Sequence, residues 1–172
     1  MVYLIVLLAV LARFIPHMPN FSPVYGALLF GGAHLRKRDS IWFPLLPLGA
    51  SDFVLTTFIY RSSIGWSELL QMTAFAAVAI TGWWLRPRVT LGRFSLACFA
   101  GPTAFYLISN FGVWLGSPMY PPTGAGFVQC YAAAIPFYGY SLASTFLYAG
   151  VLFGLYELYR ARHGHNVQAR TS

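Results

Sequence analysis

The sequence predicts an all-α, polytopic transmembrane protein, a six-helix bundle with one further short helix before the last span. Hydrophobic residues make up 58% of the 172-residue chain and charged residues only 9%, which leaves too little polar surface for a soluble domain. Apolar runs recur along the chain, and the connections between them are alternately basic and nearly free of basic residues. This alternation is typical of a chain that crosses a membrane several times.

The apolar runs give the spans in order. A spanning helix needs about 20 mostly apolar residues, and fewer where the bilayer thins. We predict one transmembrane domain over residues 1–161, with spans at about 2–16, 21–35, 40–60, 67–85, 92–116 and 140–160. The first run lacks the positive leading segment and small-residue cleavage site of a signal peptide, so we expect it to be retained. Residues 162–172 form a polar tail, which we expect to be disordered and cytoplasmic.

Two segments depart from plain spans. The second span is short, and its Gly26, Gly31 and Gly32 offer small faces for close packing against a neighbouring helix. The segment 116–139 is too long for a tight turn and too apolar for a solvated loop. Within it, Phe127 to Ile135 predicts a short helix that ends at Pro136 and lies at the membrane interface or covers the bundle as a lid.

The basic residues predict the orientation. Lys and Arg are retained on the cytoplasmic side during insertion. Of the eleven Lys and Arg residues, all but Arg13 and Arg61 fall in every second connection or near the C-terminal end. We therefore expect an even number of spans with both termini in the cytoplasm. The net charge of +7 is dispersed over short connections, which favours contact with the lipid bilayer and its anionic headgroups over nucleic-acid binding.

Polar residues within the spans indicate a candidate binding site, because they are costly inside a bilayer. Arg13, Asp52 and Asn110 fall at similar depth in the outer half, and Gln129 and Cys130 lie on the predicted lid. A few polar groups in an apolar enclosure are typical of a small-molecule pocket, here open to the outside. The alternatives stay open: Arg13 and Asp52 as a structural ion pair, Asn110 as an interhelical hydrogen-bonding group, and Cys130 as a small buried apolar residue.

The first outer connection adds His17 and Asn20 as candidates for ligand contact, although a loop histidine is commonly just solvated. Catalytic patterns are missing from the sequence: it has no nucleophile elbow, no metal-binding histidine pair at helical spacing and no phosphate-cradling glycine loop followed by Lys. We therefore expect a protein without enzymatic activity, cofactor or metal. Glu68 begins the fourth span, where a carboxylate stabilises a helix N-terminus.

Several stretches carry a resemblance to a known group of proteins. They are RFIPHMPNFSPVYGALLFGGAHL (residues 13–35), PLGASDF (47–53), ISNFGVWL (108–115), Tyr120-Pro121 and CYAAAIPF (130–137). The chain resembles an uncharacterised family of small bacterial membrane proteins, which in turn resembles the substrate-binding S components of energy-coupling-factor (ECF) vitamin transporters. The resemblance implies the bacterial cytoplasmic (inner) membrane and an S-component-like bundle.

An S component holds a vitamin or similar nutrient in an outward-facing pocket, and a membrane scaffold with ATPases drives its release inside. The residues shared with the family add Trp114 and Tyr120 to the candidate site. The alanine pair four apart through which S components often dock is not kept, because Arg13 follows Ala9 at that spacing. A solitary transporter is therefore also possible.

Two functions follow as hypotheses. The leading one is a membrane substrate-binding or uptake protein for a small, vitamin-like nutrient. The alternative is a structural or accessory subunit of a larger membrane complex. The first predicts a ligand-sized outer cavity, and the second predicts a filled bundle interior.

Overall fold

The computed structural model describes residues 2–12, 18–59, 65–116 and 118–168. Within these residues the chain is all-helical and contains no strand, as predicted. The helices are α1 (Val2–Leu11), α2 (Val24–His34), α3 (Lys37–Val54), α4 (Trp66–Thr81), α5 (Leu91–Gly116) and α6 (Gly124–Gln168). A π-helical segment, η2 (Leu55–Ile59), continues α3, and a 3-10 segment, η3 (Gly82–Leu85), continues α4.

Three helical stretches among the described residues are long and apolar enough to cross a membrane. They are Lys37–Phe58, Leu91–Gly116 and Gly124–Arg162. By contrast, α2 has 11 residues, which at a rise of about 1.5 Å per residue gives a length of about 16 Å, roughly half the hydrocarbon thickness of a bilayer. The described helices are therefore compatible with a membrane protein, and the six predicted spans stay a prediction.

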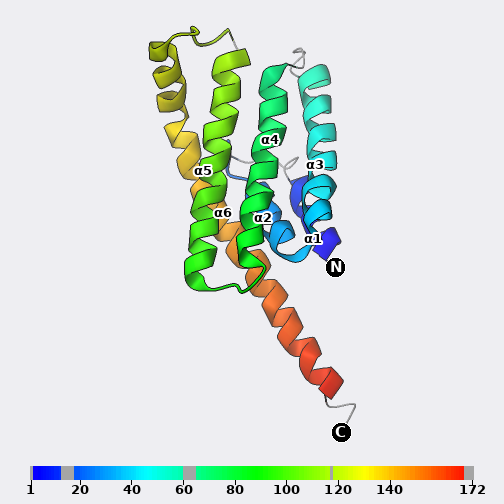
Figure 1. Cartoon of the computed structure of the whole chain (residues 1–172). Helices are drawn as coiled ribbons and strands as arrows, with labels where there is room; N and C mark the ends of the chain where they lie inside the picture. Colours follow the sequence, from blue (N-terminus) through cyan, green and yellow to red (C-terminus); the bar gives the residue numbers. More distant parts are fainter. Residues whose placement is uncertain (1, 13–17, 60–64, 117, 169–172) are drawn as a thin grey trace.

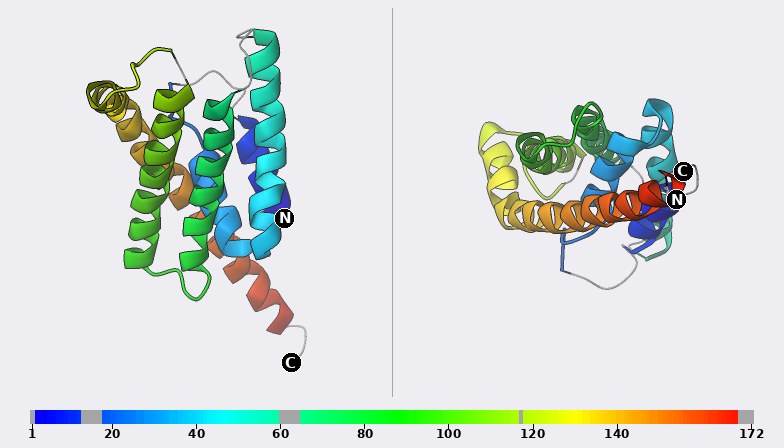
Figure 2. Two further views of the ribbon diagram at one scale, coloured as in Figure 1. Left: turned by 45° about the horizontal axis from the view of Figure 1, so that its top comes forward. Right: turned by 90° about the horizontal axis from the view of Figure 1, so that it is seen from below.

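The helices form a bundle in which α3, α4 and α5 stand side by side and α6 crosses the others obliquely (Figure 1). Seen from below, α6 runs along one side of the other helices, and its C-terminal part extends beyond them (Figure 2). The connections that carry Arg36 and Arg86 lie at the end of the bundle where α1 begins. We call this the basic end. That the basic end faces the cytoplasm stays a prediction.

Helix α2 lies in the centre of the bundle. Its Ala27, Leu28, Leu29 and Phe30 are all 0% exposed. Phe30 packs edge-to-face on Phe153 of α6, with ring centroids 5.2 Å apart. Two of the predicted small faces are used for close packing: Gly26 lies against the α6 backbone, and Gly32 lies against Ala79 of α4 and Gly82 of η3.

The predicted short helix is not separate, since α6 runs from Gly124 to Gln168 as one helix of 45 residues with Pro136 inside it. The break predicted at Pro136 is therefore wrong. An interior proline removes only one helical hydrogen bond, and apolar helices tolerate this where neighbouring groups support the backbone. Here Tyr106 of α5 contacts α6 on both sides of Pro136: its hydroxyl donates a 2.6 Å hydrogen bond to the Tyr131 carbonyl, and its ring lies 5.0 Å from that of Tyr138. These contacts hold α6 against α5; they do not replace the hydrogen bond that Pro136 removes, which concerns the Ala132 carbonyl. Residues 162–168, predicted to be in a disordered tail, continue α6.

Candidate functional site

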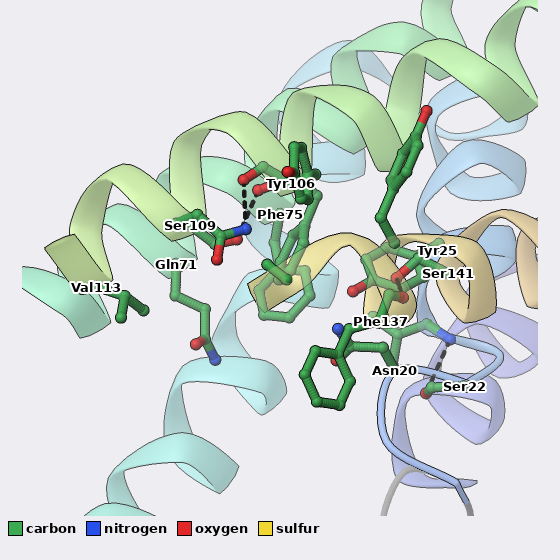
Figure 3. A pocket seen from close by; sticks show the side chains of 15 residues that line it. Asn20, Ser22, Tyr25, Gln71, Phe75, Tyr106, Ser109, Val113, Phe137 and Ser141 are labelled. Atoms are coloured by element: carbon green, nitrogen blue, oxygen red, sulfur yellow. Dashed lines mark hydrogen bonds between the residues drawn. The ribbon is translucent and has the colours of Figure 1, made fainter. Parts of the chain in front are cut away.

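A cavity of about 410 Å³ opens in the bundle near the first turns of α2 and α4 and the last turns of α5, away from the basic end. Figure 3 shows the side chains that line it. It exists because α2 begins only at Val24 and does not fill the space between α4, α5 and α6 beyond that point. The residues that line it are Asn20, Ser22, Val24, Tyr25, Gln71, Phe75, Phe105, Tyr106, Ser109, Asn110, Val113, Ala134, Phe137, Tyr138 and Ser141.

The connection before α2 forms one side of the cavity. Asn20 has a backbone φ of 59°, a left-handed conformation that asparagine adopts more readily than most residues. Its carbonyl accepts a 3.4 Å hydrogen bond from the Ser144 hydroxyl of α6, which ties the connection to that helix. Asn20 and Ser22 lie on one side of the view in Figure 3, and Gln71 and Val113 lie on the other.

Gln71 reaches the cavity from α4 and is held by a buried carboxylate. Its Nε2 donates a 2.8 Å hydrogen bond to Oδ2 of Asp52, which is 9% exposed. Because a carboxylate oxygen accepts this bond, the amide nitrogen of Gln71 must face Asp52. Asp52 itself does not line the cavity but a separate hollow of about 280 Å³ between α3 and α4. Asp52 therefore influences the cavity by fixing the orientation of the Gln71 amide.

Helix α5 contributes two polar side chains one residue apart. Ser109 Oγ donates to the Phe105 carbonyl at 2.7 Å, and Asn110 Nδ2 donates to the Tyr106 carbonyl at 2.7 Å. Both bonds run back one helical turn, which holds the side chains close to the helix and leaves Asn110 Oδ1 as an acceptor.

Aromatic rings form the floor of the cavity toward α2. The ring of Phe105 lies 5.0 Å from that of Tyr25 and 4.9 Å from that of Phe75, measured between centroids. These separations are typical of paired aromatic rings, which stabilise each other beyond their burial. The cavity thus joins an aromatic floor to a rim of amides and hydroxyls.

The sequence-predicted candidates are only partly brought together. Asn20 and Asn110 line the cavity, and Asp52 lies one side chain behind it. Cys130 is buried, with its sulfur 3.5 Å from the Asn110 carbonyl oxygen. Arg13 and His17 lie outside the described residues, so the predicted pairing of Arg13 with Asp52 stays a prediction.

The remaining candidates lie in the last turn of α5, in the connection before α6 and in the first turns of α6. Trp114 Nε1 donates to the Pro121 carbonyl at 3.2 Å, and its ring meets Phe127 edge-to-face at 5.4 Å. Tyr120 is half-buried and Gln129 is exposed, and neither is among the residues that line the cavity. Trp114 therefore fixes this connection to α5 instead of contacting the cavity.

Sequence reasoning missed Gln71, Tyr106, Ser109, Tyr138 and Ser141. Gln71 carried a usable signal, because an amide more than one turn inside a predicted span is costly unless it has a partner. The serines and tyrosines carried none, since hydroxyl side chains are common in apolar helices and their direction depends on how the helices pack.

The fold and the site define an all-helical protein with membrane-compatible helices and a polar cavity in its interior. The chain belongs to a family of unknown function, DUF6580, which it matches over residues 1–168. No curated protein and no solved structure shows significant similarity to it.

Proposed function

We propose that this protein is an integral membrane protein of the bacterial cytoplasmic membrane that binds a small, vitamin-like nutrient and takes part in its uptake. The observation that carries the proposal is the cavity of about 410 Å³, a volume within the range of small-molecule sites. Its mixture of aromatic rings and a few polar groups is also typical of such sites. The resemblance to S components of ECF transporters agrees with this role.

In this proposal the chain spans the membrane six times with both termini in the cytoplasm, and the cavity opens to the outside. The cavity serves binding without catalysis. Energy for uptake comes from a membrane scaffold with ATPases, because the sequence has no phosphate-cradling glycine loop of its own. The competing role, a structural subunit of a larger complex, requires a filled interior, and the cavity argues against it.

The test is extraction of the protein, purified in mild detergent from its native membrane, followed by mass spectrometry of the small molecules released. We expect one molecule to be enriched over a mock purification and to be lost in Asn110→Leu. This variant removes the amide but keeps the branching of the side chain, and it leaves the Tyr106 carbonyl with its backbone partner.

Leu107→Ala is the matched control, because Leu107 lies on α5 and its side chain points away from the cavity, 49% exposed. It should retain the molecule as the wild type does. Recovery of the protein free of small molecules but in fixed stoichiometry with other polypeptides would contradict the proposal and favour the structural role.

A further inference from the structure

We propose that the protein binds the phosphate headgroup of an anionic phospholipid in a second pocket, at the basic end of the bundle. This pocket has a volume of about 470 Å³ and lies where α1 begins and α2 ends, beside α6. We call it the basic pocket, and its polar and aromatic lining consists of Tyr3, His34, Arg36, Tyr156, Tyr159 and Arg160. The inference rests on the membrane location in the proposed function and is independent of the ligand in the cavity.

Two arginines from separate elements line the basic pocket. Arg36 lies in the connection after α2, and Arg160 lies on α6; both are exposed. The planar guanidinium of arginine offers five N–H donors in a fixed arrangement that matches a phosphate group. Insertion of the chain requires basic residues at this end, but it does not require two of them to line one pocket. Their convergence therefore indicates a site for a phosphate.

Neighbouring groups hold these cations in place. The guanidinium of Arg160 lies over the Tyr156 ring, with its Cζ 6.0 Å from the centroid, which is a cation–π distance. The same ring packs on His34, with centroids 4.4 Å apart. On the α2 side, the Arg86 guanidinium donates a hydrogen bond to the carbonyl of Leu35, which lines the pocket. A third cation thus lies directly behind the pocket wall.

The acidic residues leave this positive charge in excess. Four side chains of the sequence are acidic: Asp39, Asp52, Glu68 and Glu157. All four are among the described residues, and none of them lines the basic pocket. Two lie beside it, and each is opposed by an arginine: Asp39 by Arg38 at 3.9 Å, and Glu157 by Arg160 at 3.5 Å. Arg36 and Arg86 remain as the excess, which favours an anionic ligand.

The apolar surroundings favour a phospholipid over a soluble phosphate. Val2 and Leu35 line the pocket beside the charged groups. One turn further from the basic end, Ile5 of α1 and Leu152 of α6 are partly exposed apolar residues. A phospholipid matches this order, with its phosphate on the guanidinium groups and an acyl chain along the two helices. Basic pockets between membrane helices are known sites for anionic headgroups.

The test compares phosphatidylglycerol, which is anionic, with phosphatidylcholine of the same acyl chains, which is zwitterionic. The purified full chain is stripped of lipid, immobilised and equilibrated with mixed micelles of detergent and each lipid, and the bound lipid is extracted and quantified by mass spectrometry. We expect phosphatidylglycerol to bind at least about tenfold more tightly than phosphatidylcholine. Inorganic phosphate in excess should displace it no more than sodium chloride of the same ionic strength does.

The double variant Arg36→Gln/Arg160→Gln should weaken phosphatidylglycerol binding at least about tenfold, because it removes both lining cations. Arg88→Gln/Arg93→Gln is the matched control. It removes the same charge from the same end of the bundle, at two exposed positions in the connection before α5 and in its first turn, and neither residue lines the basic pocket. The control should bind phosphatidylglycerol as the wild type does.

Equal affinity for the two lipids, equal losses in the two double variants, or no saturable binding of phosphatidylglycerol would each overturn the inference. Displacement by inorganic phosphate beyond the effect of salt would assign the pocket to a soluble phosphate and also overturn it. If a double variant does not fold, as thermal unfolding without lipid would show, the comparison of the two lipids and phosphate on the wild type still decides. None of these outcomes bears on the molecule retained by the cavity or on its loss in Asn110→Leu, so failure of the two proposals can be told apart.

Discussion

The close approach of α2 and α6 gives a prediction whose size can be worked out from the structure. A Cβ added at Gly26 would lie 2.7 Å from the Ala149 backbone nitrogen and 3.0 Å from the Tyr148 backbone carbon. Carbon atoms in favourable contact lie about 3.5–4.0 Å apart, so the helices would have to separate by roughly 1 Å. Overpacking of this kind costs about 1–3 kcal/mol. We expect Gly26→Ala to lose this amount through strain.

Gly150→Ala on α6 is the control, because a Cβ there meets nothing within 4 Å. Both substitutions gain the helix propensity of alanine, about 1 kcal/mol, so this gain cancels when the two variants are compared. Gly26→Ala should therefore be less stable than Gly150→Ala by about 1–3 kcal/mol. Thermal unfolding in detergent, followed by tryptophan fluorescence, measures the difference. Equal stability, or a more stable Gly26→Ala, would refute the packing of α2 against α6.

Two further predictions concern the ends of the bundle. Arg86→Ala should lower the free energy of unfolding by about 1–3 kcal/mol, because the Arg86 guanidinium donates to the Leu35 carbonyl at the end of α2. The control Arg88→Ala, at an exposed position, should change it by less than about 0.5 kcal/mol. If thermal unfolding shows equal effects for the two variants, Arg86 does not have this role. Trp114→Ala should speed proteolytic cleavage in the connection before α6, because the indole no longer donates to the Pro121 carbonyl, and Trp114→Phe, which retains a ring against α6, should be intermediate. An unchanged cleavage rate in Trp114→Ala would rule out this tether.

The sequence predicted the helical class and the extent of two long helices, whereas α6, expected at 140–160, runs from Gly124 to Gln168. The predicted spans at 67–85 and 92–116 agree closely with α4 with η3, and with α5. These elements are indicated by their apolar composition and by the basic connections beside them, and both are local properties of the sequence. Pro136 misled the prediction, because whether a proline ends a helix depends on what supports the surrounding turn. In α6, Tyr106 contacts the helix on both sides of Pro136, and Tyr106 is distant in sequence.

The candidate site was predictable only in part. Asn110 could be named because polar side chains are unusual in apolar segments, and Asn20 because it lies in the predicted first outer connection; the structure places both on the cavity. The role of Asp52 could not be derived, since it acts through Gln71 on another helix. The cavity itself depends on α2 beginning as late as Val24, whereas the apolar run predicted a start near residue 21.

The central claim is that the cavity holds one small molecule, and native mass spectrometry of the intact protein tests it most directly. Ala134→Trp places an indole in the cavity from α6, and Ala133→Trp places one on an exposed position beside it. We predict a single added mass on the wild type and on Ala133→Trp, and none on Ala134→Trp. The same added mass on all three proteins, or on none of them, would contradict the claim.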